Sequence, residues 1–69
     1  MITTEKLEAL GFTLNQDGSW TKAGFTLYQM AAWWEYKVDH MEESRPLYGM
    51  TDVFSLYTVY TGKNINEPA

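Results

Sequence analysis

The residues best suited to acid–base chemistry lie together between residues 39 and 43. His40, the single histidine of the chain, follows Asp39 and precedes Glu42 and Glu43. Histidine titrates near neutral pH, so an imidazole beside carboxylates is a common start for a proton-transfer site. Here, however, the paired carboxylates are sequence neighbours that point apart in most conformations, unlike the facing pair of a glycosidase. We interpret the stretch as an exposed acidic loop.

Nucleophilic, metal and phosphate chemistry find little support in the sequence. A Ser-His-Asp set would need Ser19, Ser44 or Ser55 beside His40, and no nucleophile-elbow sequence surrounds these serines. The chain has no cysteine, which excludes Cys/His catalysis and zinc sites with two or more soft ligands. Its five glycines are scattered and form no phosphate-binding loop. The sequence therefore predicts a protein that is not an enzyme and needs no cofactor.

Aromatic side chains are the remaining chemical signal, at 16% of the residues. From residue 32 onward the chain alternates as a half-buried strand does, with two sets of side chains on opposite sides. One side carries Ala32, Trp34, Tyr36 and Val38, and the other carries Trp33, Glu35, Lys37 and Asp39. We expect Trp34 and Tyr36, together with Tyr28, to lie in the core.

Trp33 shares its side of the strand with charged residues, which makes it a candidate contact for a partner. Tryptophan is enriched at the energetic centres of protein interfaces. The predicted interaction residues are Trp33, Glu35, Asp39, His40, Glu42 and Glu43. The alternative is that a helix covers this side of the sheet as well.

A helix is the competing interpretation of the same stretch. Apolar residues from Leu27 through Met30, Trp34 and Val38 to Met41 fall on one helical stripe. Strands are favoured because clustered aromatics suit a pleated surface and because Gly24 precedes the stretch. A strand over 24–29 and a second from residue 32 then need a turn or bulge between them, near 30–32.

The flanking segments predict a helix at each end of the chain and two hairpin turns after the first helix. Thr3 is suited to cap a helix that ends at Gly11, with Ile2 and Leu7 packing across the cap. Strands over 12–15 and 19–22 flank an Asp-Gly turn, and Ala23-Gly24 forms the next turn. Residues 40–48 contain Pro46 and are expected to form a loop. Thr51-Asp52 is suited to cap a second helix over 53–61, which stops at Gly62.

These elements predict an α+β fold. It consists of a short N-terminal helix, a three- to four-stranded antiparallel meander and a C-terminal helix packed on the sheet. Residues 1–65 are expected to form a single domain and residues 66–69 a flexible tail. With 69 residues and no cysteine, the fold depends on burying its aromatics or on oligomerisation.

Charge and hydropathy exclude some partner classes. The net charge of −4 argues against binding to double-stranded nucleic acid, which needs a basic face. No apolar run of about 18 residues and no basic leader followed by an apolar segment is found, so we expect neither membrane span nor signal peptide. The absence of cysteine is compatible with a reducing cytoplasm.

Two short motifs resemble a group of small uncharacterised proteins found in Bacteroidetes genomes and their phages. The helix end LEALGF at 7–12 is similar to the group's LxxxGF, and LYTVYTGKNI at 56–65 is similar to its LYxxLTGxxL. Tyr60 stands where the group usually has Leu, and the segment 49–52 replaces a more polar helix start. The resemblance implies an α+β fold with a small sheet between two helices, and it implies no activity.

The leading hypothesis is a small interaction protein of the kind that phages and mobile elements carry, binding a host or defence protein. A module that binds carbohydrate or single-stranded nucleic acid through an aromatic sheet face is an alternative. A homodimeric structural domain is another alternative.

Overall fold

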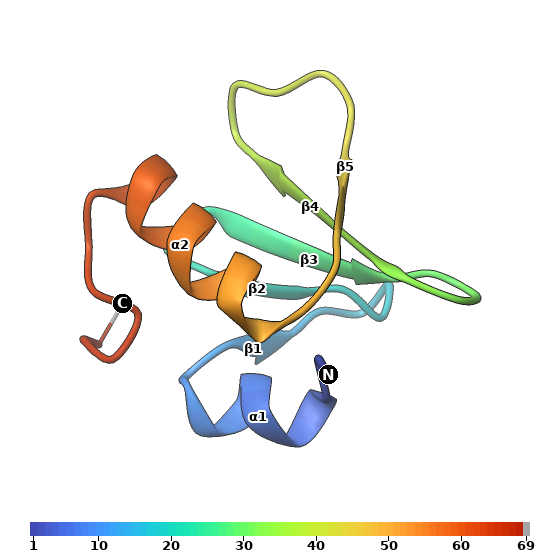
Figure 1. The fold of residues 1–69 in the computed structure, drawn as a ribbon, viewed down its shortest axis with the longest axis horizontal. Helices are drawn as coiled ribbons and strands as arrows, with labels where there is room; N and C mark the ends of the chain where they lie inside the picture. Colours follow the sequence, from blue (N-terminus) through green and yellow to red (C-terminus); the bar gives the residue numbers. More distant parts are fainter. Residues whose placement is uncertain (69) are drawn as a thin grey trace.

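The computed structural model describes residues 1–68, in which a helix, five strands and a second helix follow one another. Their bounds are α1 Thr4–Ala9, β1 Thr13–Leu14, β2 Trp20–Lys22, β3 Phe25–Gln29, β4 Trp34–Val38, β5 Arg45–Leu47 and α2 Met50–Thr61. The strands form one antiparallel sheet in chain order. α2 packs on one face of the sheet, and α1 lies near its β1 end (Figure 1). The predicted α+β architecture is confirmed, with one strand more than expected.

The first helix begins as the sequence predicts. The Thr3 hydroxyl accepts a hydrogen bond from the backbone N–H of Lys6 at 3.2 Å, which satisfies one of the free donors of the first turn. Ile2 and Leu7 are both buried on the core side of this cap. At six residues α1 is too short to persist alone, so the buried staple holds it in place.

The end of α1 is a Schellman motif built on Gly11. The Phe12 N–H bonds back to the Leu7 carbonyl and the Gly11 N–H to the Glu8 carbonyl, both at 3.0 Å. Gly11 has φ +91°, a conformation open to glycine because it has no Cβ. The chain therefore reverses sharply and delivers the buried Phe12 to the core.

Both predicted hairpin turns are present. Gly18 has φ +89°, and the preceding Asp17 carboxylate accepts hydrogen bonds from the N–H and the hydroxyl of Ser19. In the second turn both central residues are left-handed, Ala23 at φ +51° and Gly24 at φ +80°. Two positive φ angles are those of a type I′ turn, whose twist matches the flanking strands.

The central stretch forms two strands, not a helix. β3 and β4 pair with Phe25 opposite Val38 and Leu27 opposite Tyr36, and all four side chains are buried. Trp34 continues this buried face. The predicted alternation, with a turn between the strands, is confirmed.

Tyr28 was predicted to lie in the core, and this prediction is wrong. It pairs with Glu35 and shares the open face of the sheet with Thr26 and Lys37, where it is half-buried. Strand parity gives the reason, because Phe25 and Leu27 already occupy the face that α2 covers. Parity outweighs the apolar character of a tyrosine ring.

Residues 45–47 were expected to belong to a loop, but they form the fifth strand. β5 pairs with β4 through Trp34 opposite Leu47 and Tyr36 opposite Arg45. Pro46 is tolerated because β5 is an edge strand, where a missing N–H breaks no ladder bond. Leu47 is buried, which ties the strand to the core.

The second helix begins earlier than predicted, at Met50, and ends before Gly62 as predicted. Thr51 and Asp52 were expected to precede the helix but lie within its first turn, so their role as the cap was predicted wrongly. The Asp52 carboxylate instead accepts a hydrogen bond from the Tyr48 N–H at 2.9 Å. Gly62 has φ +71°, and its N–H bonds to the Thr58 carbonyl.

The core is aromatic at its centre. Phe25 stacks on Tyr36 with ring centroids 5.6 Å apart and meets the edge of Tyr57 from α2 at the same distance. Phe12 packs on the other side of Tyr57. Offset and edge-on contacts of this kind add stability beyond the area they bury. Tyr57 therefore contacts both the residue that follows the turn after α1 and the central strand β3.

Lys22 is buried in this core, with 4% of its surface exposed. Its ammonium group donates to the backbone carbonyls of Leu10 and Ile65 and lies 5.7 Å from the centre of the Tyr57 ring. Leu10 is the C-terminal cap of α1, where the helix dipole favours a cation. Lysine is seldom buried, and the sequence pattern gave no indication that Lys22 would be.

Candidate functional site

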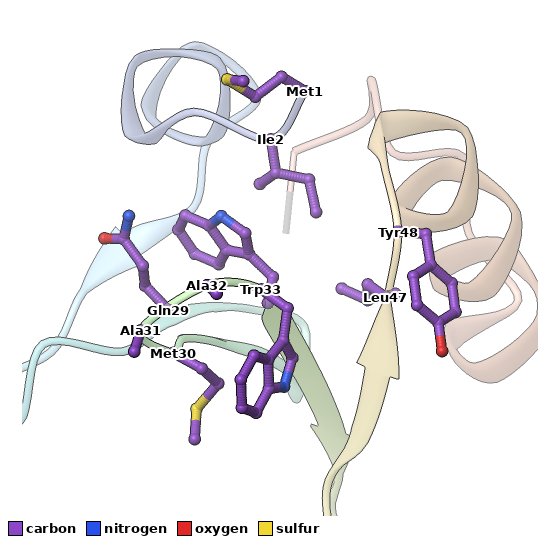
Figure 2. A pocket seen from close by; sticks show the side chains of 10 residues that line it. Met1, Ile2, Gln29, Met30, Ala31, Ala32, Trp33, Leu47 and Tyr48 are labelled. Carbon is purple, nitrogen blue, oxygen red and sulfur yellow. The ribbon is translucent and has the colours of Figure 1, made fainter.

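A groove of about 470 Å³ opens at the tip of the β3–β4 hairpin. Figure 2 shows Ile2 and Leu47 pointing into it, with Tyr48 beside Leu47 and the hairpin tip opposite. It is lined by Met1, Ile2, Gln29, Met30, Ala31, Ala32, Trp33, Trp34, Leu47 and Tyr48. None of these side chains carries a charge.

The hairpin tip is a tight four-residue turn. The Met30 N–H donates to the Trp33 carbonyl at 2.8 Å, so Ala31 and Ala32 occupy its exposed corner. The small side chains of these two alanines project little from the turn, whereas the larger side chains of Met30 and Trp33 lie at its two ends. The turn therefore presents two large apolar groups at the rim of the groove.

Trp33 is 46% exposed, so no helix covers it on this side of the sheet. Its indole N–H donates to a carboxylate oxygen of Glu35 at 2.7 Å, and the Ser44 hydroxyl donates to the other at 2.5 Å. Together these hydrogen bonds hold the pKa of Glu35 below its ordinary value, and the bond from Ser44 has the larger effect. Glu35 thus fixes the orientation of the tryptophan with both of its oxygens engaged.

The six predicted interaction residues fall into two groups. Trp33, just before β4, and Glu35, near its start, lie together, whereas Asp39, His40, Glu42 and Glu43 lie in the loop after it. Figure 1 shows the hairpin tip and the β4–β5 loop at opposite ends of β4. Six residues of extended chain separate Trp33 from Asp39 by about 20 Å, at roughly 3.3 Å per residue.

The acidic loop surrounds its own shallow pocket of about 570 Å³. His40 faces Tyr60 of α2 with ring centroids 6.4 Å apart, and Arg45 lines the pocket beside them. Asp39, Glu42 and Glu43 are exposed. Tyr60 also packs on Tyr36 of β4, and burial, aided by a hydrogen bond with Tyr60, raises the pKa of Tyr36.

The residues considered for catalysis have other partners in the structure. The Ser44 hydroxyl donates to Glu35, and the Ser19 hydroxyl donates to Asp17. Ser55 is exposed on α2. Within residues 1–68, no three His, Asp or Glu side chains gather closely enough to hold a metal ion. Neither described helix has the length and apolar character needed to cross a bilayer.

Sequence reasoning missed the side chains that complete the groove. Tyr48 is 84% exposed, and Met1 and Met30 are also exposed there. Tyr48 was placed in a loop and Met30 in a turn, with no role for either. Alternation from the buried Leu47 would have turned Tyr48 outward, but only once β5 was recognised as a strand. Contact between the N-terminal residues and the hairpin tip has no local signal.

No protein-family model, curated protein or solved structure matches this chain. The resemblance to the Bacteroidetes and phage proteins stays a prediction.

Proposed function

We propose that the protein is a non-enzymatic interaction protein that binds a partner protein at the Trp33 groove. The observation that carries this proposal is the groove lined by uncharged side chains, with exposed Trp33, Met30 and Tyr48 at its rim. Aromatic residues and methionine are enriched at the buried centres of protein interfaces, whereas charged residues are depleted there. The groove has that composition in a chain of net charge −4.

A protein fits the groove better than a small molecule does. Pockets for small molecules combine apolar walls with a few convergent polar groups that fix the ligand's orientation. Here Gln29 and Tyr48 supply the polar side-chain groups, and the Trp33 N–H is already engaged by Glu35. An apolar side chain on a partner's surface needs no such orienting groups.

The partner is expected to bind through side chains and not by adding a strand to the sheet. At the β5 edge, Pro46 has no N–H, and the next outward N–H, that of Tyr48, donates to Asp52. At the other edge, β1 is two residues long. Short and blocked edges of this kind oppose strand addition.

The acidic loop provides a second contact for a basic surface. Asp39, Glu42 and Glu43 are exposed at the far end of β4 from Trp33. Exposed charges of one sign raise association rates with an oppositely charged partner and lose this effect in salt. A partner that touches both regions therefore carries an apolar group and a basic patch about 20 Å apart along the β4 direction. By analogy with other proteins that phages and mobile elements carry, we propose a host or defence protein as that partner.

The test is affinity capture with matched variants. We expect the wild-type chain to retain a stoichiometric partner that Trp33→Ala loses and that Glu42→Lys with Glu43→Lys weakens in a salt-dependent way. Leu14→Ala is the control, because Leu14 is exposed and apolar but lies on β1 away from the groove. Equal capture by the wild-type chain and the Trp33→Ala variant would refute the groove as the binding site.

A sheet face that binds carbohydrate is the second candidate. Its support is a shallow polar pocket of about 220 Å³ on the open face, where Tyr28 lies with Thr26, Lys37 and Asp39. A tyrosine ring beside polar groups is suited to stack on a sugar. Titration with oligosaccharides should then change the fluorescence of the wild-type chain and leave a Tyr28→Ala variant unchanged. If the fluorescence of the wild-type chain does not change with added oligosaccharide, this candidate function is ruled out.

A further inference from the structure

Ser44 lies outside the Trp33 groove but is linked to it through Glu35. It is the last residue of the loop between β4 and β5, and it does not line the groove. Glu35 of β4 pairs with Pro46 of β5, so Ser44, two residues before Pro46, is a diagonal neighbour of Glu35 on the open face of the sheet. This placement explains how the Ser44 hydroxyl reaches a carboxylate oxygen of Glu35 at 2.5 Å, nine residues back along the chain.

Glu35 connects Ser44 to Trp33. Its other carboxylate oxygen accepts a hydrogen bond from the Trp33 indole N–H at 2.7 Å. Glutamate has several rotatable bonds, and a carboxylate held at one oxygen alone keeps much of its freedom to turn. The hydrogen bond from Ser44 reduces that freedom, so the acceptor of the indole stays in one place. The lowered pKa of Glu35, to which Ser44 contributes most, agrees with a carboxylate that both donors hold.

The rim of the groove depends on this support because the core does not hold Trp33. The buried wall is fixed by packing, since Ile2, Trp34 and Leu47 are each at most 9% exposed. Trp33, by contrast, is 46% exposed, and Figure 2 shows its ring at the hairpin tip, on the edge of the groove. Its hydrogen bond to Glu35 fixes the orientation of this ring, and that orientation sets the shape of the rim.

We propose that Ser44 is a positioning residue for the Trp33 groove, which acts through Glu35 to hold the indole in the orientation that a partner meets. A side chain that is ordered before binding loses less conformational freedom in the complex, which favours affinity. Ser44 also ends the loop that carries Glu42 and Glu43, so a partner that contacts this loop and displaces Ser44 releases Trp33 as well. The two contact regions are therefore coupled. The effect on affinity rests on the proposed function, whereas the orientation of Trp33 is a property of the free protein.

NMR of the indole N–H groups tests this role in the free protein. The chain has three tryptophans, and the signal that disappears in Trp33→Phe is that of Trp33. In Ser44→Ala we expect the Trp33 N–H to exchange with water about two- to tenfold faster, the range that corresponds to weakening one hydrogen bond. Ser44→Thr keeps a hydroxyl and should retain the wild-type exchange rate. Glu35→Ala removes the acceptor itself and should speed exchange at least as much as Ser44→Ala does.

The matched control is Ser55→Ala, because Ser55 is an exposed serine on α2. This variant should leave all three indole signals unchanged. The signals of Trp20 and Trp34 should also stay unchanged in Ser44→Ala, since both rings are buried and held by packing. An unchanged exchange rate for Trp33 in Ser44→Ala, or an equal change in all three tryptophans, would overturn the proposal.

Affinity capture separates the role of Ser44 from the proposed function. Ser44→Ala should retain less of the partner that the wild-type chain captures, and Ser44→Thr should retain as much. If Trp33→Ala retains the partner fully, the groove is not the binding site, and the NMR result alone decides whether Ser44 positions the indole. If Trp33→Ala loses the partner and Ser44→Ala keeps it, the groove stands and the coupling to Ser44 is refuted.

Discussion

The ammonium group of Lys22 lies 2.5 Å from the carbonyl oxygen of Ile65, 43 residues further along the chain. The same group donates to the carbonyl of Leu10 at the end of α1. One buried cation thus connects the second strand, the first helix and the C-terminal segment. Ile65 is itself buried, so the hydrogen bond and the apolar contact hold the segment together.

Replacing Lys22 is expected to destabilise the fold strongly. Lys22→Met keeps the volume of the stem but leaves two carbonyls without their donor, and each buried unpaired group costs about 1–3 kcal/mol. We therefore expect the free energy of unfolding, measured in urea, to fall by about 2–5 kcal/mol. Lys63→Met is the control, because Lys63 is exposed. Equal losses in the two variants would show that the buried ammonium contributes little.

Removing a polar group from Tyr57 is expected to have the opposite effect on stability to removing the ammonium group of Lys22. Its hydroxyl is buried and has no hydrogen-bond partner in the described chain, and burial raises the pKa of this group. Tyr57→Phe removes the unpaired hydroxyl and keeps the ring that packs on Phe12 and Phe25. We expect stability in urea to stay level or to rise by about 1 kcal/mol. A clear loss of stability would mean that the hydroxyl has a partner, such as a buried water.

The pattern of the central strands was predictable because it is local. Alternation placed Trp34 on the core face, which is confirmed, and Trp33 on the opposite side, where the sequence left open whether a helix covers it and the structure shows it exposed. The caps at Thr3 and Gly62 were likewise predicted from short motifs. Each of these features depends on residues within a few positions of one another, so a single sequence contains the necessary information.

The remaining features depend on distant segments. Lys22 is buried because carbonyls 12 and 43 residues away accept its hydrogen bonds. β5 forms because β4 provides a template, although Pro46 alone favours a loop. The Trp33 groove is completed by Ile2, 31 residues earlier in the chain. Nothing in the local sequence specifies such contacts.

Ala23 is expected to be a site of readily gained stability. It has φ +51°, in the left-handed region that costs a residue with a Cβ about 1 kcal/mol. Asparagine tolerates this conformation and is preferred before glycine in type I′ turns. Ala23→Asn should therefore raise the free energy of unfolding by about 0.5–1 kcal/mol. Ala32→Asn is the control, since Ala32 has no positive φ, and a gain of equal size there would refute the explanation.

Glu35 is expected to make stability depend on pH in the acidic range. Its pKa is lower in the folded chain than the ordinary value of 4.5, because Ser44 and Trp33 donate to the carboxylate. The folded state therefore gains stability from this group above pH 4.5 and loses it as the pH falls through the lowered pKa. Ser44→Ala should move the pKa back toward its ordinary value, measured by NMR titration of the Glu35 carboxylate. An unchanged pKa of Glu35 would show that the hydrogen bond from Ser44 does not stabilise its charged carboxylate.

The two neighbouring tryptophans are expected to differ in how much their substitution destabilises the fold. Trp34 is buried, and Trp34→Ala should lower the free energy of unfolding by about 3–5 kcal/mol, the usual loss for a large core side chain. Trp33 is half exposed and loses one hydrogen bond, so Trp33→Phe should lower it by about 1 kcal/mol or less.

Fluorescence quenching provides an independent measure of the same difference. Trp20 and Trp34 are buried, so acrylamide should quench chiefly Trp33 in the native chain. Trp33→Phe should remove most of the quenchable emission and leave the remainder shielded. Equal quenching before and after that substitution would mean that the indole at the hairpin tip is covered in solution. A covered Trp33 would also remove the exposed aromatic on which partner binding at the groove depends.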